Sequence, residues 1–440
     1  MIITKPTREI VSKVISWRWN SITINDNWPH EYEAFFADLP SLKAPSMDGY
    51  YKKCLAVREK VHNRAIIYMD AMMLNDRYPD VAAFRPEWQQ VPTTNLDYTV
   101  DGRKFQVFSS CPATEANAYF VEKAASVLKR YKFDGLYFDF GLNGICNNQL
   151  HGHQEFWPLL AMREFYRRIA LAEVENGISE PIIVLHNTDF VMPPVVSFAT
   201  HLLNGEHIRQ HSSTIMHNGK DIQDTYGLEM FASELSTLPF GLTSAIYQAN
   251  DYLLPEFGGG KEEHDLYKFR ITKAFLAGAL PHNSMLSPLR CHYGIFDKLF
   301  RVYERFDVPQ ARFTGYWRNP ATVEGAQNIY VSCYTSPDGK RLLAVISHIG
   351  KEHLNQDFTV TFNPAVLGLT SKPATALDTL PAPDPDYDEL LPKRNRLKIH
   401  YTRAPLKLGD FGSRILSYDS STMQLKFHLD FHSFAIVEFK

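Results

Sequence analysis

The segment of residues 133–140, Phe-Asp-Gly-Leu-Tyr-Phe-Asp-Phe, constrains the fold most, because a short apolar run ends at one carboxylate, Asp139, just before Gly141. A buried parallel strand that delivers one acid to the mouth of a barrel has this pattern. The preceding residues, 116–131, carry apolar side chains at helical spacing. Together these segments indicate one α/β unit whose reactive end is Asp139. The alternative is that Asp139 only caps a loop, as acids at strand ends often cap helices.

Strand-like and helix-like segments alternate over roughly the first 310 residues, and polar residues follow the strand-like runs. Amphipathic helices are expected over residues 155–174 and 263–277. The strand-like runs are residues 64–70, ending at Asp70; 181–185, before His186 and Asn187; 195–203, before Gly205 and Glu206; 241–247, before Asn250; and 278–286, which contain His282. Repeated β-then-α units with polar strand ends indicate an α/β fold, a (β/α)8 TIM-like barrel over residues 1–312.

Two parts of this region fit the barrel less directly. The stretch from Met72 to Thr114 has no clear period and is expected to form an elaborate loop. A doubly wound open sheet is the alternative architecture, but no glycine-rich phosphate turn follows a first strand. The barrel is therefore the favoured prediction.

The pattern changes after about residue 315, where short alternating runs are separated by Asp-Gly, Asn-Pro and proline-rich turns. Such runs are typical of an antiparallel β-sandwich. We expect a C-terminal antiparallel β-sandwich domain over residues 313–440. A barrel followed by a small sandwich is frequent in carbohydrate-active enzymes, which is an analogy of fold.

The bulk composition limits the classes of partner. The net charge is -3 with no basic stripe, which argues against a nucleic-acid partner. No apolar run reaches the roughly 18 residues of a spanning helix, and the N-terminus lacks the layout of a signal peptide. The expected location is the cytoplasm, or the periplasm or exterior after removal of a leader. The 5 cysteines form no Cys-x-x-Cys pair, so free buried thiols are expected. The oligomeric state is not indicated.

Asp139 and Glu206 are the predicted catalytic residues. If the strand that ends at Asp139 is the fourth of the barrel, the run before Glu206 is the sixth, and alternate strands point into the same layer. Glycoside hydrolysis needs two carboxyl groups that flank the scissile bond. Asp139 would act as the nucleophile or charge-stabilising carboxylate, and Glu206 as the general acid/base. The alternative for Glu206 is a solvated loop acid.

The loop at residues 141–153 is dense in amide and imidazole side chains, which suit the hydroxyl groups of a sugar. The alternative is a structured loop that satisfies its own backbone. A metal-binding interpretation of His151 and His153 needs a third ligand from elsewhere, such as His186, His207 or His282, so no metal and no cofactor are predicted. The predicted substrate-binding residues are Asp70, Asn148, His151, His153, His186, Asn187, Asn250 and His282.

With these residues in view, the chain resembles a largely uncharacterised group of bacterial carbohydrate-utilisation proteins that have a glycoside-hydrolase-like domain related to family 123. The resemblance covers roughly residues 60–310. It is carried by Asp139, Cys146, Asn148, His151, Gly152, Gly205 and Glu206. Family-123 enzymes use an adjacent Asp-Glu pair, whereas Asp139 is followed by Phe140. The resemblance therefore implies a barrel, a sugar-sized cleft and two separated carboxylates, without N-acetylhexosaminidase activity.

The sequence predicts a glycoside hydrolase acting on an oligosaccharide or polysaccharide. A second hypothesis is a non-catalytic carbohydrate-binding protein on a degenerate barrel, which the missing Asp-Glu pair favours. A third is a polysaccharide lyase or hydrolase that depends on histidine or a metal and uses His151, His153 and His207. The sugar, the linkage, and the choice between retention and inversion or between internal and terminal cleavage are not indicated.

Overall fold

The computed structural model describes residues 66–76, 78–100, 103–131, 133–139, 141, 144–152, 156–186, 191–204, 222–235, 243–248, 261–288, 293–381 and 411–440. The chain divides into two compact units. Unit 1 comprises residues 1–204 and 240–243, and unit 2 comprises residues 205–239 and 244–440. The predicted domain boundary between residues 312 and 313 stays a prediction.

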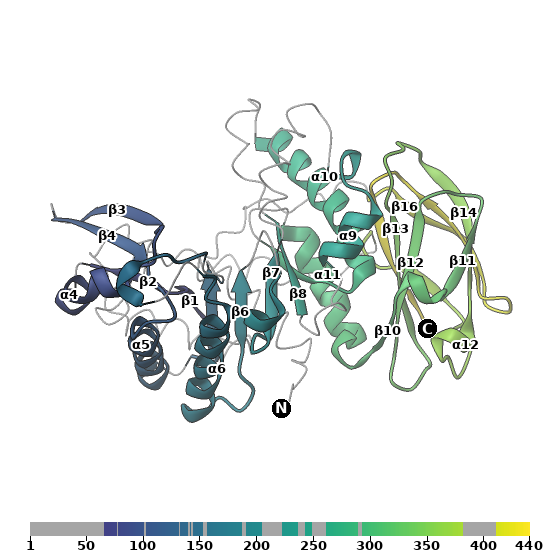
Figure 1. The fold of residues 1–440 in the computed structure, drawn as a ribbon. Coiled ribbons are helices and arrows are strands. Elements are labelled where there is room, and N and C mark those ends of the chain that lie inside the picture. The colour runs from purple at the N-terminus through teal and green to yellow at the C-terminus, as the bar shows by residue number, and fades with distance from the viewer. Residues whose placement is uncertain are drawn as a thin grey trace. The chain divides into compact units, whose positions relative to one another are not determined.

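Unit 1 contains a parallel sheet with the strand order β1-β5-β6-β7. The strands are β1 (Ile66–Asp70), β5 (Gly135–Asp139), β6 (Ile183–His186) and β7 (His201–Asn204). The helices are α5 (Ala116–Tyr131), α6 (Leu159–Glu175) and the short α7 (Pro193–Val196), and α5 and α6 lie side by side (Figure 1). The predicted strand at residues 133–140 and helix at 116–131 are confirmed.

One face of this sheet packs against α5 and α6. The strand side chains in that core alternate along each strand: Met69, Leu136, Phe138, Ile183, Leu185 and Leu202. Phe138 shows the packing most clearly, because its ring makes edge contacts with Phe165 and Tyr166 of α6 at centroid distances of 5.7 and 5.5 Å. Successive side chains of a strand point to opposite faces. The residues that follow these core residues therefore point to the face away from the helices.

The stretch from Met72 to Thr114 is folded, so the expectation of an elaborate loop was wrong. It contains a three-stranded antiparallel sheet in the order β2-β4-β3 and one helix. These elements are β2 (Met73–Asn75), α4 (Pro79–Trp88), β3 (Asn95–Val100) and β4 (Arg103–Ser109). Leu96, Tyr98 and Val100 alternate with polar residues, and Asp-Gly follows them at residues 101–102, so the sequence contains a hairpin signal that the prediction missed. Pro86 interrupts the helical pattern of α4.

Unit 2 begins with the strands and helices that follow β7 in the chain. They are η3 (Ile222–Asp224), α9 (Leu228–Leu235), β8 (Thr243–Gln248), α10 (Lys261–Ala279), η5 (Leu280–His282), β9 (Met285–Pro288) and α11 (Tyr293–Phe306). Strand β8 pairs with β9 in parallel. The first residue of β8, Thr243, is assigned to unit 1 and the rest of the strand to unit 2.

Two predicted strands are shorter than expected. Residues 278–282 belong to α10 and η5, and residues 195–196 to α7. A short apolar run does not by itself distinguish a buried helix end from a strand.

Two antiparallel sheets follow, as the sequence predicts. The first has the order β10-β12-β13-β18-β15 and the second β11-β14-β17-β16. The strands are β10 (Arg312–Thr314), β11 (Ala321–Glu324), β12 (Ile329–Thr335), β13 (Leu342–His348), β14 (Gln356–Phe362), β15 (Ala376–Asp378), β16 (Ser413–Asp419), β17 (Gln424–Leu429) and β18 (Phe434–Phe439); η6 (Val308–Gln310), η7 (Tyr316–Arg318) and α12 (Pro364–Leu367) complete unit 2 (Figure 1). One of the short alternating runs in the sequence, at residues 396–400, is predicted as a strand and lies outside the described residues.

Each face of the first antiparallel sheet has its own core. Side chains of β12, β13 and β18 that include Val331, Ala344 and Val437 pack with β14 and β17 of the second sheet. On the other face, Leu343, Val345 and Ile436 share a core with α10 and α11. The α10–α11 pair and the sandwich are therefore packed as one body within unit 2.

None of the helices in the described part of the chain combines the length and hydropathy of a membrane span.

We expect Gly135→Ala to destabilise unit 1. A Cβ atom at Gly135 would lie 2.4 Å from the carbonyl oxygen of Ile182, so β5 and the chain entering β6 would have to separate. Overpacking of this kind costs about 1–3 kcal/mol. Urea unfolding should show a lower midpoint. Gly144→Ala is the control, since its methyl group would meet the flexible end of Gln90 at 3.2 Å; equal midpoints for the two variants would contradict the prediction.

Candidate functional site

Three polar side chains form a row across the carboxyl ends of neighbouring parallel strands. Asp70 ends β1 and is in register with Asp139, which ends β5. His186 ends β6 and follows Leu185, the register partner of Phe138. Each of the three directly follows a residue of the core that α5 and α6 cover, so all three point to the opposite face of the sheet. The carboxyl ends of parallel strands are where α/β folds place functional groups.

Asp139 and His186 are in direct contact. The Nδ1 atom of His186 lies 2.8 Å from Oδ1 of Asp139. The Asp139 side chain is 24% exposed and that of His186 is 5% exposed, while Asp70 is 1% exposed. Asp139 is thus the most exposed member of the row, and a buried imidazole contacts its carboxyl group.

The chain that leaves β5 is fixed by hydrogen bonds. The backbone N–H of Gly141 donates to the carbonyl of His186 at 3.3 Å, and the hydroxyl of Tyr166 donates to the Gly141 carbonyl at 2.6 Å. The backbone N–H of Ala71 donates to the Asp139 carbonyl at 2.8 Å. Tyr166 is fully buried, which raises the pKa of its phenol, so the hydroxyl keeps the proton that it donates. These contacts hold the strand end that carries Asp139.

His201 lies on the same face, one row further from the strand ends, where it is in register with Val184. It is fully buried, and burial lowers its pKa to about 3. Its imidazole is therefore neutral at physiological pH and contacts the Thr200 hydroxyl at 2.7 Å. The face away from the helices thus carries a neutral imidazole next to the row of Asp70, Asp139 and His186.

Asn148, a predicted substrate-binding residue, binds backbone groups. Its side-chain amide donates to the carbonyls of Pro86 at 3.0 Å and Gln89 at 2.8 Å. Its Oδ1 accepts from the N–H of Leu150 at 3.0 Å at the start of η2 (Gln149–His151). These bonds attach the loop at residues 144–152 to the end of α4.

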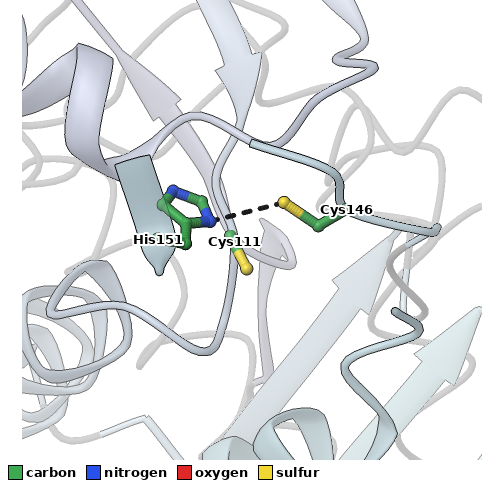
Figure 2. Close-up of side chains that lie close together, drawn as sticks. All are labelled: Cys111, Cys146 and His151. Carbon is green, nitrogen blue, oxygen red and sulfur yellow. Dashed lines mark hydrogen bonds between the residues drawn. The ribbon is translucent and has the colours of Figure 1, made fainter. Parts of the chain in front are cut away.

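His151 lies beside two cysteines that the sequence analysis did not single out as site residues (Figure 2). Its Nδ1 atom is 3.4 Å from the Sγ atom of Cys146, and the ligand atoms of Cys111, Cys146 and His151 all lie within 4.8 Å of one another. Both thiols are buried and free. A Cys-x4-His pair with a distant third cysteine has no recognised spacing, so only the fold brings them together.

Of the remaining predicted residues, His282 is the one that the structure describes. His282 belongs to unit 2, where its Nδ1 contacts the Gly278 carbonyl at 2.8 Å and its Nε2 contacts the Tyr316 hydroxyl at 3.2 Å. It is 1% exposed, and burial lowers its pKa to about 4. The residues Glu206, His153, Asn187 and Asn250, and also His207, lie outside the described residues. Their roles, and those of the described candidates, stay predictions.

No protein-family model matches the chain, and no curated protein matches it in sequence. Solved structures do match. The noncanonic maltogenic α-amylase AmyB from Thermotoga neapolitana is similar over 97% of this chain and 93% of its own, at 12% identity and a TM-score of 0.51. This likeness shows the fold, an α/β barrel-like N-terminal region with a parallel sheet, followed by antiparallel sheets.

Two further structures match with lower scores. One is the α-amylase from Geobacillus thermoleovorans in complex with acarbose, at 11% identity, covering 100% of this chain and 95% of that one, with a TM-score of 0.49. The other is a Paenibacillus cycloisomaltooligosaccharide glucanotransferase in complex with cycloisomaltoheptaose, at 9% identity, covering 99% and 83%, with a TM-score of 0.47. The likeness to AmyB concerns the fold alone, and no comparison assigns the chain to family 123.

We expect Asn148→Asp to destabilise the protein at least as much as Asn148→Ala. An aspartate could still accept from Leu150, but its second oxygen would face the carbonyls of Pro86 and Gln89. Leaving these groups without a donor costs about 1–3 kcal/mol. Thermal unfolding measures the effect, with Asn147→Asp as the control for the added charge. A smaller loss for Asn148→Asp than for Asn148→Ala would show that the capping oxygen matters more than the amide donors.

Proposed function

We propose that this protein hydrolyses glycosidic bonds in an oligosaccharide or polysaccharide and that Asp139 is one of its two working carboxyl groups. The observation that carries the proposal is the position of Asp139. It is a partly exposed acid at the carboxyl end of β5, a parallel strand flanked by β1 and β6, and it contacts a buried histidine. The fold likeness to AmyB supports this class of reaction at the level of architecture.

Asp139 suits the part of the nucleophile or charge-stabilising carboxylate. Such a group has to meet the anomeric carbon at a fixed distance and angle, which requires a rigid support. The contact with His186 at 2.8 Å and the backbone bonds of Gly141 and Ala71 supply that rigidity. Glu206 remains the proposed general acid/base, two strands further along the chain.

Asp70 has a different part in this proposal. It is in register with Asp139 but is almost fully buried, so a sugar does not reach its carboxyl group as it reaches that of Asp139. A buried polar group next to a working carboxylate sets the local field and the packing. We therefore place Asp70 among the positioning residues of the site.

Removal of either proposed catalytic carboxyl group should abolish most of the activity. Asp139→Asn and Glu206→Gln keep the shape of each side chain, and each should lower kcat by about 10²–10⁴-fold, the usual share of one such group. Reducing-end release from a panel of oligosaccharides gives the rate. Asp80→Asn, at an exposed position in α4, is the control. Unchanged rates for both site variants would remove the assignment.

His186 should act as a positioning residue for Asp139. Since its Nδ1 atom is the group in contact with Oδ1, His186→Asn, which retains a polar side chain there, should lose less activity than His186→Ala. The effect should fall on kcat with little change in KM, because the contact orients a reacting group. Steady-state kinetics of the two variants decide this. If both variants kept the kcat of the wild-type protein and only their KM rose, His186 would be assigned to substrate binding.

A sugar-binding protein without catalysis is the second candidate. It is supported by Phe140, which stands where an adjacent Asp-Glu pair would need its glutamate. Calorimetry with the same oligosaccharides separates the two functions. Tight binding with no product after long incubation would favour the binding protein, whereas product formation that depends on Asp139 would favour the hydrolase.

A further inference from the structure

Three segments of unit 1 bring two thiols and one imidazole together (Figure 2). Cys111 follows β4, and its backbone N–H donates to the Trp88 carbonyl at 2.7 Å. Cys146 forms an isolated bridge with Phe156. His151 ends η2. Thiolate sulfur and neutral imidazole nitrogen are the ligands that zinc prefers in proteins.

We propose that Cys111, Cys146 and His151 bind one zinc ion. Zinc–sulfur bonds of about 2.3 Å and zinc–nitrogen bonds of about 2.0–2.1 Å at tetrahedral angles separate the sulfur from the nitrogen by roughly 3.5 Å. The measured separation of Cys146 Sγ and His151 Nδ1 is 3.4 Å. The other ligand pairs lie within 4.8 Å, so the three atoms need only small rotations to meet at one ion.

The charge of this donor set also fits zinc. Two thiolates carry two negative charges and the imidazole is neutral, so a divalent cation makes the site neutral overall. That balance matters because both cysteines are 0% exposed. Burying unpaired charge is costly, whereas a neutral metal centre can be buried without that penalty.

The cysteine–histidine segments are held in place by bonds that do not involve the ligands. The side chain of Gln90 donates to the Ile145 carbonyl at 3.0 Å, and the N–H of Asn147 donates to the Val91 carbonyl at 2.7 Å. Asn148 adds its two bonds to Pro86 and Gln89. A prearranged set of ligands binds a metal more tightly than one that must be ordered on binding.

The position of the cluster would let one ion link two segments of unit 1. Cys111 lies near the end of the insertion that follows β1, the strand that ends at Asp70. Cys146 and His151 lie in the loop that follows β5, the strand that ends at Asp139. One zinc ion would cross-link the insertion after β1 to the loop after β5. Three protein ligands leave a fourth tetrahedral position, which catalytic zinc sites fill with water and structural sites with a fourth protein ligand.

A disulfide between Cys111 and Cys146 is the competing interpretation of the two sulfurs. The structure has both as free thiols, and a disulfide would give His151 no role. The contact of the imidazole nitrogen with Cys146 favours the metal.

The test uses the full chain, purified under reducing conditions, stripped with a chelator and then titrated with Co²⁺ and with Zn²⁺. We expect about one ion per chain and a thiolate-to-cobalt charge-transfer absorption, which zinc abolishes by displacement. Cys111→Ser, Cys146→Ser and His151→Asn should each weaken zinc binding by at least about 100-fold, the upper range for loss of a supporting partner. Cys333→Ser, at a buried free cysteine of β12, is the matched control and should leave the affinity unchanged.

A second measurement keeps the test decisive where a variant fails to fold. Relative to the chelator-stripped wild-type protein, the zinc-loaded protein should show slower alkylation of Cys111 and Cys146, as mapped by peptide mass spectrometry. A thiol-specific mercurial should release the zinc. Absence of the cobalt–thiolate absorption in the reduced protein would overturn the proposal. So would unaltered zinc affinity in all three ligand variants, or isolation of a metal-free chain with a Cys111–Cys146 disulfide.

Discussion

The packing of the parallel strands of unit 1 against α5 and α6 is the constraint on which the candidate site depends. Because Phe138 must enter the aromatic core with Phe165 and Tyr166, the next residue, Asp139, has to point to the other face. The same alternation applies to Met69 before Asp70 and to Leu185 before His186. The apolar side chains thus fix the face of the sheet to which the polar row points and its position at the carboxyl ends of the strands.

The row gains its chemical character from unequal burial. Asp70 and His186 are almost completely enclosed, while Asp139 keeps part of its surface open. An enclosed imidazole in contact with an open carboxylate gives a group that is rigid and still reachable. One fold of this kind can host many different reactions, so the function has to be inferred from the site residues and not from the fold.

The sequence predicts the parts of this fold that are strongly periodic. The helix at residues 116–131 is confirmed because a long amphipathic pattern is specific to a helix. The strand at 133–140 is confirmed because Gly135 and Gly141 bound a run too short for a helix. The insertion between β1 and α5 was predicted as a loop, although the alternation in β3 and the Asp-Gly that follows it at residues 101–102 indicate a hairpin. The site was only partly predictable, since Asp139 and His186 follow visible strands, whereas Cys111 meets Cys146 and His151 only through the folded insertion.

The shared core of α10, α11, β13 and β18 has a consequence for how the chain can be divided. Leu343, Val345 and Ile436 are fully buried against side chains such as Phe275 and Leu299 of the two helices. A fragment that began at the sandwich would present these aliphatic residues to water as one continuous patch, and such patches promote aggregation. The sandwich is therefore a folding partner of the last two helices, and an excised sandwich would have to take those helices with it to stay in solution.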